Sequence, residues 1–178
     1  SSMGDGYGPR LVATAERPAD PREAIRGKRI AVPGKLTTAY LALRLYQPEF
    51  EAVVVPFDQI EGAVLRGEVD VGLLIHEGQL TYADDGLALW TDLGEWWMGE
   101  TGLPLPLGGN VVRRDLGPEL TAQVATDLRA SIEYALAHRE EALEYASRYN
   151  RGIGAERTDT FVGMYVNHWT VDYGERGR

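Results

Sequence analysis

Apolar and polar positions alternate in a way that predicts strands and helices in turn along this chain of 178 residues. Apolar runs of strand length stand at residues 11–15, 29–32, 52–55, 69–75 and 87–90. The run at 69–75 is nearly continuous, which is typical of a strand buried on both faces of a parallel sheet. Helical patterns lie between the later runs, over residues 37–46 and 58–65, the second of them opened by Asp58 as its cap. The alternation predicts a layered α/β/α unit with a parallel or mixed sheet.

The last third of the chain changes to helical periodicity. Aliphatic side chains recur at every fourth position within residues 118–138, which predicts one amphipathic helix. A second helix is expected over residues 139–150, and a final one from Thr158 to beyond Trp169. Residues 105–113, which precede these helices, are expected to form a strand.

Charge and composition exclude several classes of partner. The net charge is -9 and no basic patch is visible, so neither nucleic acid nor an anionic membrane surface is an expected partner. The absence of cysteine excludes disulfides, thiolate catalysis and thiolate-bound metal within the chain. No apolar run approaches the ~20 residues that span a bilayer, and residues 1–6 lack the pattern of a secretory signal. These features fit a cytoplasmic protein, which is the expectation, and a mature exported protein that has lost its signal would show the same pattern.

A glycine turn and two threonines join the strand at residues 29–32 to the next helix. A helix start has unpaired N–H groups and a partial positive charge, so it suits a carboxylate or another anion. The spacing differs from a Walker A loop, since no second glycine precedes Lys35. The alternative is that Thr37 or Thr38 only caps the helix. Both interpretations can hold, because one threonine is enough for the cap.

His76 directly follows the buried strand at residues 69–75. In open α/β sheets, ligands bind at the edge where such strands end, and a neutral histidine near pH 7 is suited to accept a proton. Of the two other histidines, His138 is expected to be a solvated cation at a helix end, and His168 a packed residue beside a tryptophan. Position therefore makes His76 the candidate base, against the alternative of a hydrogen-bonded loop histidine.

Two further features concern ligands and metals. Gly108 and Gly109 allow close approach of backbone or ligand, and Asn110 after them has an amide that can hydrogen-bond a ligand. A bend between lobes explains the glycines equally well. No two histidines stand at ligand spacing and no carboxylate cluster joins them, so no metal site is predicted.

Taken in order, these motifs resemble the 1,4-dihydroxy-6-naphthoate synthases, enzymes of the futalosine route to menaquinone. The similarity includes the turn V-P-G-K-L-T-T-A and the segment I-H-E-G-Q, and it covers essentially the whole chain. The similar segments are residues 31–41, 67–70, 75–82, 92–97, 101–109, 134–143 and 165–167.

The resemblance implies an α/β fold like the type II periplasmic binding proteins, with two α/β lobes around a cleft. It implies a lyase that cleaves cyclic dehypoxanthinylfutalosine to 1,4-dihydroxy-6-naphthoate and a three-carbon fragment, with no metal or redox cofactor. The histidine of the I-H-E motif is the implied proton acceptor, and here it is His76. With the features above, the expected contacts of this small-molecule substrate are Thr37, Thr38, Ala39, Gln79 and Asn110.

The resemblance also divides the chain. The family begins with a further stretch of roughly half a lobe, so we expect a fragment in which one lobe is incomplete. Residues 28–104 are expected to form the whole second lobe, and residues 1–27 and 105–178 part of the first.

Two other functions stay open at this point. A non-catalytic solute-binding protein of the same fold is one, because fold does not fix function, and it would tolerate replacement of His76. A ligand-sensing domain of a transcription regulator is the other, and it requires an attached DNA-binding helix-turn-helix. The I-H-E-G-Q segment favours the enzyme.

Overall fold

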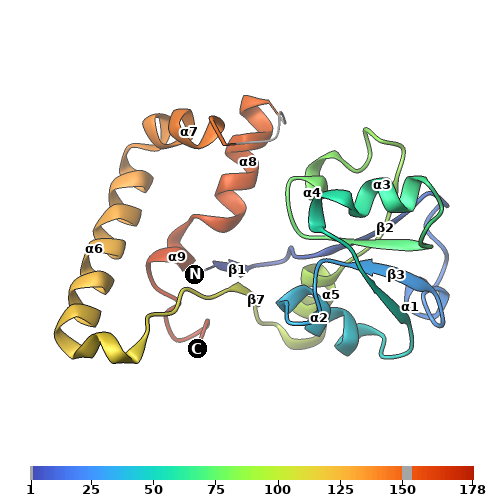
Figure 1. Ribbon diagram of the computed structural model, residues 1–178, viewed down its shortest axis with the longest axis horizontal. Helices are drawn as coiled ribbons and strands as arrows, with labels where there is room; N and C mark the ends of the chain where they lie inside the picture. The colour runs from blue at the N-terminus through green and yellow to red at the C-terminus, as the bar shows by residue number, and fades with distance from the viewer. Residues whose placement is uncertain (1, 150–153) are drawn as a thin grey trace. The chain divides into compact units, whose positions relative to one another are not determined.

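A computed structural model describes residues 2–149 and 154–178 (Figure 1). The chain divides into two compact units, which are described separately. The larger unit is Gly4–Leu105, and the smaller one is Ser1–Met3 with Pro106–Arg178.

The larger unit consists of a five-stranded sheet and the helices that cover it. Its strands are β2 (Arg10–Ala13), β3 (Arg29–Val32), β4 (Glu51–Val54), β5 (Val71–Leu74) and β6 (Ala88–Asp92). Its helices are α1 (Pro21–Ala24), α2 (Thr38–Tyr46), α3 (Ile60–Leu65), α4 (Gly78–Thr81) and α5 (Leu93–Thr101), with a 3₁₀ turn η1 (Phe57–Gln59) before α3. The five apolar runs all become strands, as the sequence predicted.

The sheet is mixed, with the strand order β4-β3-β5-β2-β6. Strand β3 runs parallel to β4 and β5, whereas β2 is antiparallel to β5 and β6. The register pairs Arg10, the first residue of β2, with Leu74, the last residue of β5, and with Asp92, the last of β6. The carboxyl ends of the parallel strands and the start of β2 therefore share one edge of the sheet.

The boundary between the two units differs from the expected one because of the position of β2. Sequence reasoning placed residues 1–27 with the C-terminal segment and began the complete lobe at residue 28. In the structure, residues 4–27 contribute β2 and α1 to the larger unit. The physical reason is that β2 lies inside the sheet, between β5 and β6, where both of its edges are hydrogen-bonded.

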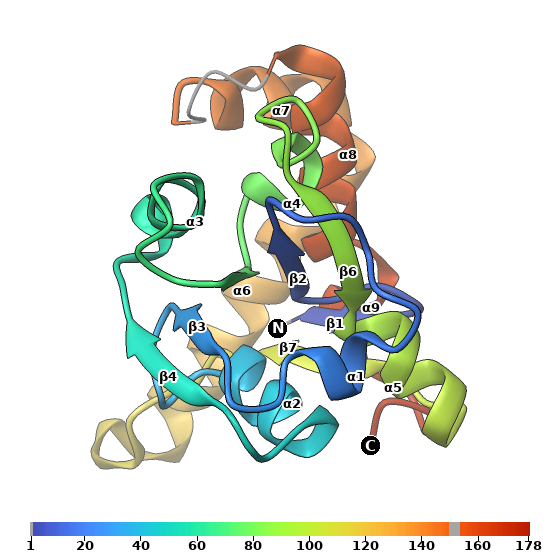
Figure 2. The same ribbon diagram turned by 90° about the vertical axis from the view of Figure 1, so that its right-hand side faces the viewer.

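Helices cover both faces of this sheet, so its strands are apolar on both sides (Figures 1 and 2). Helix α3 covers one face, where Ile60 and Val64 pack in a core cluster with Val12 and Ala31. Successive strand residues point to opposite faces, so the fully buried Leu11 turns to the other side, as do Ile30 and Leu73. Helices α2 and α5 contact each other on that second face.

Polar side chains fix several helix ends in the larger unit. Thr37 caps α2 and Asp92 caps α5, and Asp20 caps α1. The expected cap of α3 was wrong, because the helix begins at Ile60 after η1, and its N-cap Gln59 makes no side-chain cap hydrogen bond.

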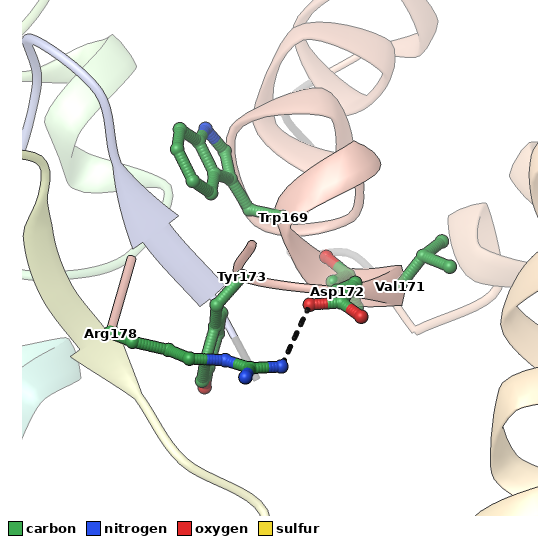
Figure 3. Close-up of a pocket in the computed structure, with 6 residues that line it drawn as sticks. Trp169, Val171, Asp172, Tyr173 and Arg178 are labelled. Atoms are coloured by element: carbon green, nitrogen blue, oxygen red, sulfur yellow. Dashed lines mark ion pairs between the residues drawn. The ribbon is translucent and has the colours of Figure 1, made fainter. Parts of the chain in front are cut away.

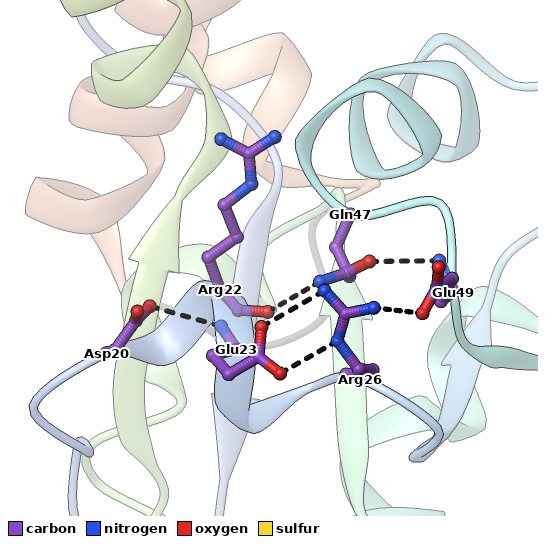
Figure 4. A network of polar contacts seen from close by, with 6 residues as sticks. All are labelled: Asp20, Arg22, Glu23, Arg26, Gln47 and Glu49. Atoms are coloured by element: carbon purple, nitrogen blue, oxygen red, sulfur yellow. Dashed lines mark hydrogen bonds and ion pairs between the residues drawn. The ribbon is translucent and has the colours of Figure 1, made fainter.

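A polar network of exposed charged side chains and the buried Gln47 ties α1 to the turn before β4 (Figure 4). Arg26 pairs with Glu23 on α1 and with Glu49 across the turn. The amide of Gln47 donates to the carbonyl of Arg22 at 3.0 Å. The charged side chains of this network are exposed, so solvent screens their charges.

The smaller unit is mostly helical. Strand β1 (Ser2–Gly4) pairs with β7 (Leu105–Gly108), and a 3₁₀ turn η2 (Arg114–Leu116) leads to α6 (Gly117–Ala137), α7 (Arg139–Ser147), α8 (Ala155–Tyr165) and α9 (His168–Val171). Helix α6 contacts α7 and α9, and α7 contacts α8. Residue 150, the last of the expected second helix, lies outside the described residues.

Three expectations for this unit were wrong. The strand expected over residues 105–113 ends at Gly108. The final helix is broken, because Asn167 is extended and forms a capping box that starts α9 as a separate helix. His168 is exposed, while its neighbour Trp169 is buried. In the described part of the chain, no helix is long and apolar enough to cross a bilayer.

Candidate functional site

Three loops of the larger unit meet at the carboxyl edge of the sheet. The loop after β3 carries Thr37, the loop after β4 carries Phe57, and the loop after β5 carries His76. They share an edge because β4, β3 and β5 are adjacent and parallel. The structure thus brings together two of the motifs that the sequence singled out, although they are about forty residues apart.

The two threonines have different roles at the start of α2. The hydroxyl of Thr37 accepts from the N–H of Tyr40 at 3.1 Å and donates to the carbonyl of Gly34 at 2.8 Å, so its proton and one of its two lone pairs serve the cap. The half-buried Thr38 makes no side-chain hydrogen bond to another described residue. Ala39 is buried, so only its backbone can face a ligand. The N–H groups of Thr38 and Ala39 precede the first helical hydrogen bond, whose donor is Leu41.

His76 is half-buried at the end of β5. Its ring centroid lies 4.0 Å from that of Phe57, with an angle of 43° between the two planes. The carbonyl of His76 accepts a hydrogen bond of 2.8 Å from the N–H of Gln79, in the first turn of α4. The aromatic contact restricts the imidazole and the hydrogen bond fixes the backbone that carries it, which suits a group that must meet a substrate in one orientation.

Gln79, in the short helix that follows His76, has its side chain in the interior of the unit. Its side chain is 1% exposed, and its amide donates to the carbonyls of Gly8 at 2.9 Å and Leu74 at 3.3 Å. A buried amide that satisfies backbone carbonyls holds the fold together locally. The burial does not support the expected contact of Gln79 with substrate, which stays a prediction.

An ion pair that sequence reasoning missed lies at the same edge. Nε of Arg10 is 3.0 Å from Oδ2 of Asp92, and a second nitrogen of the guanidinium, Nη1, donates to the carbonyl of Gln79. Burial raises the pKa of the Asp92 carboxyl, while the hydrogen bond from Arg10 and those from the α5 backbone act in the opposite direction. The sequence offers no signal for this pair, because its members are 82 positions apart.

A second carboxyl group approaches the histidine loop from α3. An ideal Cβ placed on Gly78 would lie 2.9 Å from Cδ of Glu61, so the carboxyl group packs closely against this glycine. Among the described residues, Oε1 of Glu61 is buried and has no hydrogen-bond partner. Burial raises the pKa of the Glu61 carboxyl, and the charge of Asp85 raises it further.

The remaining candidates lie elsewhere. Asn110 is exposed in the smaller unit, after the end of β7. That unit also has a hollow of about 250 Å³ beside α9, lined by Trp169, Tyr173 and the Asp172–Arg178 ion pair (Figure 3).

Within residues 2–149 and 154–178, no three His, Asp or Glu side chains gather closely enough to hold a metal ion.

Comparison with known proteins links this arrangement to menaquinone biosynthesis. A family model described as "Menaquinone biosynthesis" matches residues 1–178. The chain is 45% identical over 176 residues to a 1,4-dihydroxy-6-naphthoate synthase of Thermus thermophilus, and 40% identical over 182 residues to one of Streptomyces coelicolor. Each alignment covers 99% of this chain and 63% of the relative, so the chain spans less than two thirds of those proteins.

Solved structures show the same fold. A crystal structure of an Archaeoglobus fulgidus protein matches with a TM-score of 0.91 and 50% identity, over 98% of this chain and 64% of that one. The alkanesulfonate-binding protein SsuA of Xanthomonas axonopodis matches with a TM-score of 0.67 at 15% identity, over 92% of this chain and 58% of that one. At that identity the likeness concerns the fold alone, and it confirms the expected α/β fold of the type II periplasmic-binding-protein kind.

Proposed function

The chain belongs to the menaquinone biosynthesis family, and from that premise we propose that its protein is a 1,4-dihydroxy-6-naphthoate synthase. The proposed reaction is the cleavage of cyclic dehypoxanthinylfutalosine to 1,4-dihydroxy-6-naphthoate, started when His76 removes a proton. The enzyme is proposed to work in the cytoplasm. The two synthases that match over 99% of this chain support the activity.

One observation carries the proposal for the site. His76 and the open start of α2 lie at the same edge of one sheet, at the ends of the adjacent parallel strands β5 and β3. A base and a set of hydrogen-bond donors at one edge are the two elements that proton abstraction from an oxygen-rich molecule requires.

Each group in this arrangement has a distinct task. Neutral His76 accepts the proton, and its ring is held against Phe57. The hydroxyl of Thr38 and the first-turn N–H groups of α2 hold a substrate oxygen, with Thr37 occupied as the cap. Aromatisation of the product drives the cleavage after the proton has been removed. The expected substrate contact of Asn110 stays a prediction.

The experiment uses the full-length protein with purified cyclic dehypoxanthinylfutalosine, and it follows naphthoate formation by chromatography. The wild type is expected to form the product, and His76→Ala to lose about 10²–10⁴-fold in kcat, which is the usual contribution of a general base. His138→Ala is the matched control. That histidine is exposed at the end of α6 and stacks on Tyr134, so its loss should leave the rate unchanged.

Two outcomes would contradict the proposal. A His76→Ala variant with nearly full activity would reject the catalytic assignment while leaving the reaction. No product from the wild type, together with measurable binding of the compound, would instead favour a solute-binding protein of the same fold.

A further inference from the structure

Arg10 connects three parts of the larger unit that meet at the histidine edge. Its Nε pairs with Oδ2 of Asp92 at 3.0 Å, and its Nη1 donates to the carbonyl of Gln79. The guanidinium carbon also lies 5.9 Å from the ring centroid of Tyr82, which directly follows α4. One side chain therefore contacts both ends of α4 and anchors them to the start of α5.

Helix α4 needs such an anchor because it is very short. It has four residues, Gly78–Thr81, and no side chain caps its start. A helix of that length has no stability of its own, so tertiary contacts must hold it in place. The amide of Gln79, which donates to the carbonyls of Gly8 and Leu74, is a second tether between α4 and the sheet.

A backbone hydrogen bond connects α4 to His76, the proposed base. The N–H of Gln79 donates to the carbonyl of His76 at 2.8 Å, so a shift of α4 moves the backbone of His76. From this geometry we infer that Arg10 is a positioning residue, which sets the orientation of His76 by holding α4 to Asp92. The inference rests on the proposed role of His76.

The guanidinium of Arg10 makes these two contacts with two different nitrogens. Its nitrogens form a planar fork, so Nε reaches the carboxylate while Nη1 reaches the carbonyl, whereas a lysine ammonium is a single point charge. Asp92 is the fixed end of the bridge, because its side chain is 1% exposed and its other oxygen accepts from Gly94 at 2.9 Å. The Arg10 side chain is 20% exposed, so the pair is largely shielded from solvent.

The variant Arg10→Lys separates positioning from stability. Lysine keeps a positive charge beside Asp92, so the fold is expected to stay as stable as the wild type in urea. The contact with the carbonyl of Gln79 is expected to be lost. Amide hydrogen exchange in residues 75–82 should then rise about tenfold or more, while the strands of the sheet stay protected. In the full-length protein, kcat is expected to fall about 10–100-fold, as for a displacement of about 1 Å, with a smaller change in KM.

Arg26→Lys is the matched control. Like Arg10, Arg26 joins two groups with one guanidinium. Its partners are the carboxylates of Glu23 and Glu49, and they lie on the exposed surface beside α1 (Figure 4). This change should alter neither the exchange of residues 75–82 nor kcat. A third variant, Arg10→Ala with Asp92→Asn, removes both charges together, and it should show the same local rise in exchange as Arg10→Lys.

The exchange measurement needs no substrate, so it tests the inference even if the proposed reaction is wrong. Wild-type exchange in residues 75–82 of Arg10→Lys would overturn the inference. Increased exchange over the whole unit would overturn it as well, since Arg10 would then be only a stability residue. If the wild-type protein makes naphthoate, full kcat in Arg10→Lys would also overturn it, whereas no naphthoate from the wild type would count against the proposed function alone.

Discussion

Two glycines of α5 offer a sharp test of the packing at the histidine edge. Gly94 lies in the first turn of the helix, where an ideal Cβ would be 2.0 Å from the carbonyl carbon and the carbonyl oxygen of Tyr7. The same Cβ would be 2.4 Å from the backbone nitrogen of Gly8. Gly99 lies in the same helix with nothing within 4 Å of its Cβ position. The substitution to alanine is chemically identical at both positions, and only the surroundings differ.

The expected magnitudes follow from these distances. Ordinary contact begins near 3.4 Å, so Gly94→Ala forces α5 and the chain at Tyr7 apart by about 1.4 Å. Overpacking typically costs about 1–3 kcal/mol, and here backbone rather than a movable side chain is in the way, so we expect about 3 kcal/mol or more. Gly99→Ala instead gains helix propensity, which stabilises by roughly 0.5–1 kcal/mol.

The two variants can be compared by urea unfolding, followed by the fluorescence of Trp96 and Trp97 on α5. Gly94→Ala should lower the midpoint and Gly99→Ala should raise it, with similar slopes, so that the midpoints report stability. The result that would refute the reasoning is a Gly94→Ala protein within about 1 kcal/mol of Gly99→Ala. Such a result would mean that the close approach between Tyr7 and Gly94 does not exist in solution.

Further predictions concern the start of α2 and the carboxyl of Glu61. Thr37→Ala should destabilise the protein by about 1 kcal/mol through loss of the cap, and Thr37→Ser should not. Thr38→Ala should leave urea stability within about 0.5 kcal/mol but raise KM in the naphthoate assay; an unchanged KM would remove Thr38 from the site. Burial raises the pKa of Glu61, so the stability that its protonated form contributes at low pH is lost as pH rises through the folded-state pKa. Glu61→Gln should therefore be more stable than the wild type at neutral pH, by at most about 1 kcal/mol after solvent screening, and thermal unfolding should show no difference below about pH 4.

Several features of the larger unit were determined by the sequence itself. Apolar runs placed every strand of its sheet, and in β3 and β5 burial on both faces leaves no polar alternation. The threonine before α2 is a local capping signal, and Thr37 acts as the cap. The position of His76 at the edge of the sheet was predictable for the same reason, since the residue comes directly after a buried run; its role stays a prediction.

Tertiary structure alone decided which residues became neighbours. The antiparallel insertion of β2 between β5 and β6 brought Arg10 to Asp92 and Gln79, which lie 82 and 69 positions away in the chain. It also buried the amide of Gln79, which the sequence had placed in a loop that contacts substrate. Local patterns encode backbone conformation through periods of two and 3.6 residues. The partners of a side chain instead depend on strand order and direction, which no local period contains, so the position of His76 at the sheet edge was predictable and the contacts of Arg10 were not.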